Sequence, residues 1–496
     1  MKFSVFLLAL AFPISCIAQR DIQEKVYSKF LNDTVRYHVT VPENWDKSQS
    51  CPVLYSFKYG MVDGPYIASQ LRYFKTANYF IPNTIVVTIL ADMDRIGLIY
   101  ETGLLTNTGK NLTSCLRNEI IPNVKEKYHT SFFKTYLGHS YGASYANYLF
   151  QNEPDIFNGY ILLAAEKTGA DYSEPSPFVI DKKLVGFYDH RNTFYYAAVG
   201  EHDLQRRHTY VREIEKKVSV LDSNHFFFKY DSIPGGDHTN ILTLAIQPAL
   251  EHIYLRYNPG MRAGVSNDAW TNFTENQKYI EKTYGILAEK GNRWYGPSAQ
   301  MALRDKDTTA LLKIAEYFGS EKARASDIRN LGDHLASSGL KGKAMEYYER
   351  AIKSIETSTD KADWQIFVLG DCYLNIATKI FEKEPKEGWI YLLKGLKLAE
   401  VKGESGARNI DAYFRAGKYA IDNNYKIKDG IDFLLHYASL RTETIDEIHW
   451  SYERIYLILA KGYYALKDFE NAKLYLKKVL VFNADNKEAK EMLGKI

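Results

Sequence analysis

Three residues in the first half of the chain are of the types that attack and transfer acyl groups. Ser140 is the central residue of Gly138-His139-Ser140-Tyr141-Gly142, and Asp203 and His238 follow it in that order. A serine hydroxyl is a weak nucleophile until a base takes its proton, so His238 would accept the proton of Ser140 and later donate it to a leaving alcohol. A carboxylate would hold the imidazole in the required tautomer. We therefore expect a serine, acid and histidine triad.

The segments on either side of Ser140 are those that a sharp strand–turn–helix motif needs. Residues 132–137 are aromatic and β-branched, which predicts a buried strand. Residues 143–150 are rich in small residues and have helical spacing. In this context the pattern G-x-S-x-G predicts a nucleophile elbow, because the glycines allow a strained turn that lifts the serine hydroxyl above the edge of the sheet.

The acid is expected on the loop that follows the strand predicted over residues 194–199. Asp203 is the first candidate on this loop. Glu201 lies two residues earlier on the same loop and remains an alternative. Either carboxylate would come after the serine and before the histidine, as the order of such a triad requires.

The base is expected on the loop that follows the next predicted strand, over residues 226–230. That strand leads into Gly235-Gly236-Asp237-His238, which makes His238 the candidate base. Asp237 is a poor candidate for the acid, because a neighbour in sequence does not easily reach the far ring nitrogen. An oxyanion hole would use the backbone N–H of Tyr141 and a second N–H from the loop at Tyr59, after the strand predicted over residues 52–57.

Four segments between about residue 20 and residue 255 are similar, in order, to motifs of one esterase family. That family includes enterochelin and ferri-bacillibactin esterases, esterase D and feruloyl esterases. The segments correspond to its opening strand, its next strand and loop, the helix before the elbow and the segment after the elbow helix: Pro52-Val53-Leu54-Tyr55; Thr84-Ile85-Val86-Val87-Thr88-Ile89 with Asp94-Arg95; Glu119-Ile120-Ile121-Pro122 with Lys127-Tyr128; and Glu153-Pro154-Asp155-Ile156-Phe157.

This resemblance implies an α/β-hydrolase fold, a mostly parallel sheet flanked by helices. It implies that Ser140 is the nucleophile, His238 the base and Asp203 the acid, acting on carboxylic esters of the siderophore or acylated-sugar class. Two loops depart from the family pattern. Residues 57–60 replace a Leu-Asp-Gly-like loop, and Ala164-Ala165-Glu166-Lys167 stands where a Ser-Pro-Ser-aromatic stretch is usual. Both loops line the substrate pocket, so they bear on substrate identity more than on reaction type.

The composition of the 496-residue chain sets further limits. A hydrophobic content of 46% and a charged content of 25% are ordinary for a soluble globular protein. A formal charge of +3 is small for this length and argues against nucleic acid as the main partner. The sequence contains no metal-ligand spacing, so we expect neither a metal nor a cofactor.

The first eighteen residues have the pattern of a secretory signal peptide. Lys2 precedes an apolar run over residues 3–12, and Cys16-Ile17-Ala18 ends in small residues. The run is too short for a stable transmembrane anchor. We expect an exported protein, periplasmic or secreted, with a lipoprotein anchored through Cys16 as the less favoured alternative. Export makes a disulfide between Cys51 and Cys115 possible, but buried thiols are the more common outcome for widely spaced cysteines.

The pattern becomes helical after residue 260. Small residues recur at Ala344, Gly388, Gly430 and Ala472, at intervals of 44, 42 and 42 residues. Large apolar residues follow each of them three and four positions later. This pattern resembles an array of tetratricopeptide (TPR) repeats, in which small residues allow paired helices to approach closely. An irregular helical domain is the alternative.

These observations divide the chain into four parts: a signal peptide at 1–18, an α/β-hydrolase esterase domain at 19–258, a helical linker region at 259–320 and TPR-like repeats at 321–496. The expected function is that of an exported serine esterase that forms an acyl-enzyme on a small-molecule or acylated-sugar ester. The repeats would offer a surface to a protein partner. The alternative is an envelope scaffold that binds through the repeats and carries a vestigial hydrolase domain.

Overall fold

The structure is a computed structural model that describes residues 20–43, 45–58, 62–77, 81–169, 176–257, 268–287, 292–320, 323–358, 361–401, 409–440 and 449–496. The expected signal peptide, including Cys16, and the expected oxyanion residue Tyr59 lie outside these ranges. Within them, every helix is too short or too polar to cross a bilayer.

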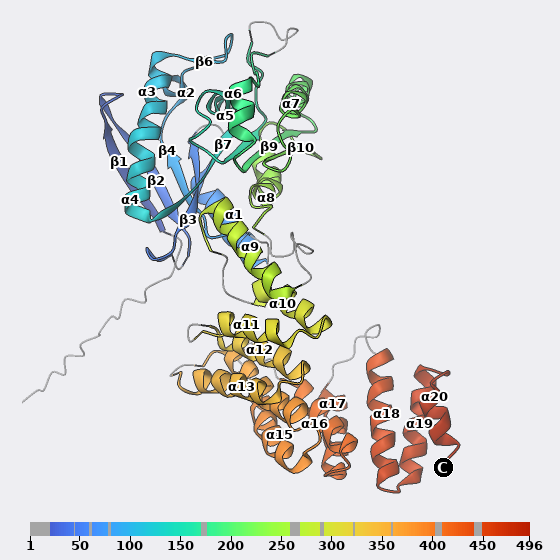
Figure 1. Cartoon of the computed structure of the whole chain (residues 1–496). Coiled ribbons are helices and arrows are strands. Elements are labelled where there is room, and N and C mark those ends of the chain that lie inside the picture. The colour runs from blue at the N-terminus through green and yellow to red at the C-terminus, as the bar shows by residue number, and fades with distance from the viewer. Residues whose placement is uncertain are drawn as a thin grey trace, which may run out of the picture. The chain divides into compact units, whose positions relative to one another are not determined.

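An eight-stranded, mostly parallel sheet forms the centre of the first half of the chain (Figure 1). Its strands lie in the order β1-β2-β4-β3-β7-β8-β9-β10. The strands from β4 to β10 in this order run parallel, whereas β2 is antiparallel to both β4 and β1. A separate ribbon pairs β5 with β6. The strands are β1 (Arg20–Ser28), β2 (Asp33–Val41), β3 (Cys51–Phe57), β4 (Ile85–Ile89), β5 (Leu98–Ile99), β6 (Leu104–Leu105), β7 (Thr130–His139), β8 (Gly159–Leu163), β9 (Thr193–Gly200) and β10 (Phe226–Ile233).

Helices cover both faces of this sheet. On one face, α1 and α8 contact each other and the central strands. On the other, α3, η1, α4, α5, α6 and α7 contribute to one large apolar cluster with the strands. The helices are α1 (Gly64–Thr76), α2 (Met93–Ile96), α3 (Asn107–Cys115), the π-helical segment η1 (Leu116–Ile120), α4 (Ile121–Tyr128), α5 (Tyr141–Asn152), α6 (Lys182–Tyr188), α7 (Gln205–Val218) and α8 (Ile241–Ile253).

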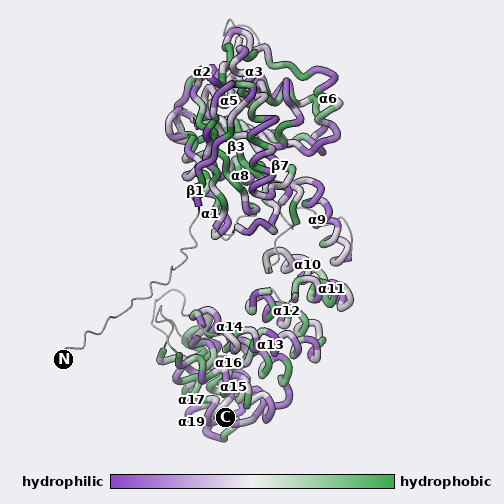
Figure 2. Tube along the Cα trace, turned by 90° about the vertical axis from the view of Figure 1, so that its left-hand side faces the viewer, coloured by the Kyte–Doolittle hydropathy of each residue, from purple (hydrophilic) through white to green (hydrophobic). Residues whose placement is uncertain are grey.

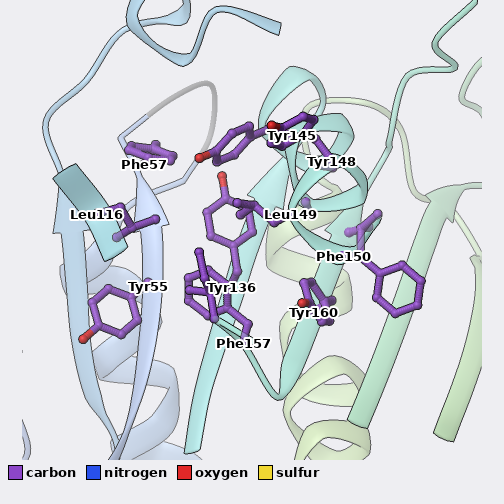
Figure 3. Packing of buried hydrophobic residues seen from close by; sticks show 14 of the residues in the cluster. Tyr55, Phe57, Leu116, Tyr136, Tyr145, Tyr148, Leu149, Phe150, Phe157 and Tyr160 are labelled. Atoms are coloured by element: carbon purple, nitrogen blue, oxygen red, sulfur yellow. The ribbon is translucent and has the colours of Figure 1, made fainter. Parts of the chain in front are cut away.

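Burial on both faces explains why the central strands lack an alternating pattern. Every residue of β3, β4, β8 and β9 is buried, so these strands are continuous apolar runs. Aromatic side chains fill the space between the sheet and α5 (Figure 3). Tyr136, for example, lies between Phe157 and Tyr145, with ring centroids 5.6 and 5.8 Å away. A mostly parallel sheet with helices on both faces confirms the α/β-hydrolase fold class.

The strand register brings three loops to one edge of the sheet. His139 at the end of β7 pairs with Leu163 at the end of β8, and Gly200 at the end of β9 pairs with Ile233 at the end of β10. Parallel strands end at the same edge, so the loops after β7, β9 and β10 meet there. In open parallel sheets this carboxyl edge is where ligands bind.

The chain forms two compact units. Unit 1 comprises Met1–Arg262 and Glu275–Glu289, and unit 2 comprises Ala263–Thr274 and Lys290–Ile496. Helix α9 (Ala269–Tyr284) therefore contributes residues to both. Tyr284 is fully buried, with its ring centroid 4.7 Å from that of Phe133 in β7. The boundary expected at residue 258 thus leaves out a segment that belongs to the core of unit 1.

Unit 2 is all-helical in its described residues. Consecutive helices pack as pairs: α12 with α13, α14 with α15, α16 with α17, and α18 with α19. Hydrophobic and hydrophilic residues alternate along these helices (Figure 2). After α9 they are α10 (Asn292–Arg304), α11 (Thr308–Phe318), α12 (Ala325–Ser337), α13 (Lys341–Glu356), α14 (Asp363–Asn375), the π-helical segment η3 (Ile376–Ile380), α15 (Pro385–Ala399), α16 (Asp411–Asp422), α17 (Ile427–Leu440), α18 (His449–Ala465), α19 (Phe469–Phe482) and α20 (Lys487–Leu493).

The four recurring small residues lie where helices approach closely. Ala344 and Ala472 are fully buried on α13 and α19. A Cβ on Gly388 would lie 2.0 Å from the hydroxyl of Tyr419, and one on Gly430 would lie 2.7 Å from Cβ of Ala420. The spacing therefore marks positions where a larger side chain would separate neighbouring helices. The three cysteines in the described ranges, Cys51, Cys115 and Cys372, are buried, and no disulfide joins any two of them.

Candidate active site

Ser140 occupies a strained turn between β7 and α5. Its φ of 53° and ψ of −118° lie in a region that residues with a side chain rarely adopt, at a cost of about 1–3 kcal/mol. A Cβ on Gly138 would lie 2.2 Å from the carbonyl oxygen of Gly142, so only glycine fits at position 138. The backbone N–H of Ser140 donates to the carbonyl of Leu163 at 2.8 Å, which ties the turn to β8. The expected strand–turn–helix geometry is therefore present.

His238 and Asp203 come together from the two neighbouring loops. His238 Nδ1 lies 3.3 Å from Asp203 Oδ2, and the Asp203 side chain is only 2% exposed. The two loops touch through glycines, since a Cβ on Gly200 would lie 2.4 Å from the carbonyl carbon of Gly236. Glycine at position 200 thus allows the acid loop to approach the base loop closely enough for this contact.

No hydrogen bond joins Ser140 Oγ to the imidazole of His238 among the described residues. In unliganded enzymes such catalytic hydrogen bonds are often long and tighten only when substrate is bound. The loop of the base is nevertheless held next to the turn of the nucleophile. His139, the residue before Ser140, donates through Nε2 to the backbone carbonyl of His238 at 2.8 Å.

The alternative acid and the neighbouring aspartate have other partners. Glu201 Oε2 accepts a hydrogen bond from the backbone N–H of Gly235 at 2.9 Å. Asp237 Oδ1 accepts from the hydroxyl of Thr239 and from the backbone N–H groups of Asn240 and Thr239, and these hydrogen bonds hold the pKa of Asp237 below its usual value. Both carboxylates therefore stabilise the base loop, and the carboxylate that reaches the His238 ring is that of Asp203.

Of the two expected oxyanion donors, Tyr141 lies within the described residues and Tyr59 does not. Tyr141 follows Ser140 directly and begins α5. Its side chain is anchored, because the hydroxyl donates to the carbonyl of Leu98 at 2.6 Å. Tyr59, the other candidate, lies outside the described residues.

A small cavity begins one helical turn beyond the nucleophile. Its volume is about 100 Å³, and Ser144, Asn147 and Gln151 of α5 line it together with Thr168 of the loop after β8. These groups are uncharged hydrogen-bonding partners. Among the described residues, no group of three or more histidine, cysteine, aspartate or glutamate side chains is arranged to hold a metal ion.

Sequence reasoning missed three residues of this site. His139 is the first of the two variable residues of G-x-S-x-G, and its place in that motif is the only signal that could have singled it out. Arg207 binds the acid Asp203, four residues earlier on the chain. Glu166 binds Arg207 from a segment about forty residues away. Charge alone does not distinguish a buried ion pair from a solvated one, so the sequence gives no signal for these two residues.

Solved structures of other proteins are similar to this chain in fold. No protein-family model and no curated protein matches the chain. A crystal structure of an uncharacterised protein from Capnocytophaga ochracea is similar with a TM-score of 0.50 and 15% identity, over 75% of this chain and all of that one. An IroE-like serine hydrolase from Shewanella oneidensis has a TM-score of 0.44 and 15% identity, over 59% of this chain and 96% of its own.

The feruloyl esterase module from Clostridium thermocellum, in complex with sinapinate, has a TM-score of 0.36 and 18% identity, over 48% of this chain and 88% of its own. At these identities the likeness concerns the fold, and the chemistry has to be argued from the site itself.

Proposed function

We propose that the chain is a serine esterase that hydrolyses carboxylic esters through an acyl-enzyme on Ser140. One combination of observations carries the proposal. A serine with φ of 53° directly follows β7, and an imidazole paired with a buried carboxylate lies on the loops at the same edge of the same sheet. A nucleophile, a base and an acid in this order are what the reaction requires.

In the proposed first half-reaction, His238 Nε2 takes the hydroxyl proton as Ser140 Oγ attacks the ester carbonyl. The backbone N–H of Tyr141 donates to the oxygen that becomes negative in the tetrahedral intermediate. His238 then protonates the alcohol as it leaves, and Ser140 keeps the acyl group. Water, deprotonated by His238, releases the acid in the second half. Asp203 accepts the Nδ1 hydrogen of His238 throughout and stabilises the imidazolium.

The proposed substrates are siderophore esters or acylated sugars, the classes implied by the sequence resemblance. We also propose that the chain is exported through residues 1–18 to the periplasm or the exterior. The helix pairs of unit 2 support a TPR-like array, for which we propose a protein partner. The scaffold alternative predicts that unit 2 binds while unit 1 has no turnover.

The test is hydrolysis of p-nitrophenyl acetate by the purified chain. Ser140→Ala removes the proposed nucleophile and should abolish turnover without lowering the melting temperature. Ser114→Ala is the matched control, because Ser114 lies on α3 and its hydroxyl donates only to the carbonyl of Lys110 one turn earlier. Full activity in Ser140→Ala would refute the assignment of Ser140 as the nucleophile. A well-folded wild type without ester turnover would favour the scaffold.

A further inference from the structure

A buried set of charges surrounds the acid of the proposed triad. Asp203 Oδ1 accepts hydrogen bonds from Arg207 Nη1 and from the backbone N–H of Leu204, the latter at 2.7 Å. Asp203 Oδ2 is the atom near His238. The two carboxylate oxygens therefore have different partners. Since Arg207 and Leu204 fix one oxygen, they fix the direction in which the other faces the imidazole.

Arg207 is itself held by Glu166. Its Nε and Nη2 atoms lie 2.9 and 2.6 Å from Glu166 Oε2, and both side chains are only 8% exposed. Glu166 Oε1 accepts a further hydrogen bond from Arg206 Nε at 2.6 Å. A guanidinium is planar and presents its donors in a fixed fork, so anchoring two of its nitrogens on Glu166 determines where the third one points. That third nitrogen is the one on Asp203.

The backbone of Glu166 is anchored to the helix of the nucleophile. Ser144 Oγ donates to the carbonyl of Glu166 at 2.7 Å and lies 3.1 Å from its N–H group. Ser144 is one helical turn after Ser140. Contacts therefore run from the helix that begins at the nucleophile, through Glu166 and Arg207, to the acid. Glu166 also belongs to the segment 164–167 that follows β8, and its carboxylate is buried there.

We infer that Glu166 and Arg207 are positioning residues of the triad. Glu166 orients Arg207, and Arg207 orients Asp203 so that its free oxygen accepts the Nδ1 hydrogen of His238. The inference rests on the proposed esterase function for its kinetic consequence. Its structural consequence, the tautomer of the His238 ring, is independent of that function. An imidazole whose Nδ1 hydrogen is bound by a carboxylate keeps Nε2 free to accept the proton of Ser140.

The test compares four variants of the full chain. Arg207→Gln removes the positive charge and the planar set of donors, whereas Arg207→Lys keeps the charge alone. Glu166→Gln removes the carboxylate that holds Arg207. Arg117→Gln is the matched control. Arg117 also joins two carboxylates, Glu153 and Asp155, but these lie at the far end of α5 from Ser140. The Arg117 side chain is 33% exposed, so this control reports the loss of an ion pair that joins two carboxylates and does not match the burial of Arg207. A general loss of such an ion pair affects the control as well, whereas a loss of triad geometry does not.

Two readouts are taken on every variant. The first is kcat and KM for p-nitrophenyl acetate. We expect Arg207→Gln to lower kcat about 10- to 100-fold with KM within about twofold, as is typical when a group that orients a functional residue is removed. Glu166→Gln should lower kcat less, and Arg207→Lys should recover part of the loss. Arg117→Gln should keep the wild-type kcat.

The second readout is the ¹H–¹⁵N long-range NMR spectrum of histidine-labelled protein, with the His238 signals identified by their loss in His238→Gln. We expect the Nδ1–H tautomer in the wild type and in Arg117→Gln, and a shift toward Nε2–H in Arg207→Gln. This pattern in a protein without ester turnover would refute the esterase proposal and leave the positioning inference standing. An unchanged tautomer, with a kcat in Arg207→Gln equal to that of Arg117→Gln, would overturn the inference.

Discussion

The imidazole of His139 donates its Nε2 hydrogen to the backbone carbonyl of His238, and the two ring centroids are 4.7 Å apart. A carbonyl oxygen only accepts hydrogen bonds, so His139 carries a hydrogen on Nε2. Burial lowers the pKa of His139 to about 4. The residue before the proposed nucleophile therefore holds the loop of the proposed base, and it does so without a charge of its own.

Replacing His139 should make stability less dependent on pH. In the unfolded chain a histidine gains a proton as the pH falls through 6.5, whereas folded His139 stays neutral down to about pH 4. Protonation of the unfolded state thus lowers stability across this window, by about 1.4 kcal/mol per pH unit for each such histidine. His252 adds a similar contribution, because burial lowers its pKa to about 4 as well.

Melting temperatures from pH 7 to pH 5 test this prediction. The decrease should be smaller in His139→Leu than in the wild type. At pH 7 the variant should already be less stable, because the partly buried carbonyl of His238 loses its donor at a cost of about 0.5–1.5 kcal/mol. His252→Leu serves as a second variant with the same expected flattening. Parallel pH profiles for all three proteins would contradict the neutral, buried state of His139.

The two carboxylates of the acid loop should differ sharply in their effect on turnover. Asp203→Asn should lower kcat by about 10⁴-fold, because an amide cannot hold the imidazole in the required tautomer. Glu201→Gln should leave kcat within about twofold of the wild type, since a glutamine oxygen still accepts from the N–H of Gly235. Steady-state kinetics on p-nitrophenyl acetate measure both. The reverse ranking would move the acid to Glu201.

Tyr284 should contribute strongly to the stability of unit 1, although it lies beyond the expected end of that domain. Its ring contacts Phe133 and Phe194, and its hydroxyl donates to the carbonyl of Ile253. Tyr284→Ala should therefore cost about 3–5 kcal/mol, as other buried aromatic deletions do. Tyr27→Ala is the control, since Tyr27 is 60% exposed on β1. Equal melting temperatures for the two variants would contradict the packing of α9 in the core of unit 1.

Two glycines in unit 2 should respond in opposite ways to the same substitution. Alanine favours a helix over glycine by about 1 kcal/mol. Gly342 on α13 has open space around it, so Gly342→Ala should raise stability by up to this amount. Gly388→Ala should lower it, because its Cβ would lie 2.0 Å from the Tyr419 hydroxyl. Urea unfolding measures both, and a stabilising Gly388→Ala would contradict the close approach of α15 and α16.

The sequence predicted best where a local pattern is sufficient. The strained turn at Ser140 follows from two glycines between a strand and a helix, and the loops of Asp203 and His238 follow from chain order. The buried ion pair of Glu166 and Arg207 joins residues about forty positions apart. Nothing local distinguishes these side chains from solvated charges, because their burial depends on how β8 and α7 are placed.

The boundary of unit 1 also depends on tertiary packing that a local sequence pattern does not show. Strand signals end before residue 258, yet the last turns of α9 return to unit 1. The helical pattern of residues 269–284 predicts a helix but does not indicate which core that helix joins. Tyr284 is an aromatic residue at a helical spacing, and such a residue fits either unit. Its position among Phe133, Phe194 and Tyr254 depends on tertiary packing.

The central claim is that Ser140 carries the acyl group during ester hydrolysis. It is tested most directly by mass spectrometry of the protein quenched with acid during turnover of p-nitrophenyl acetate. The account predicts an added acetyl group on the peptide that contains Ser140, present in Ser114→Ala and absent from Ser140→Ala. Turnover in the wild type with no acyl group on that peptide, or with the group on another residue, would contradict it.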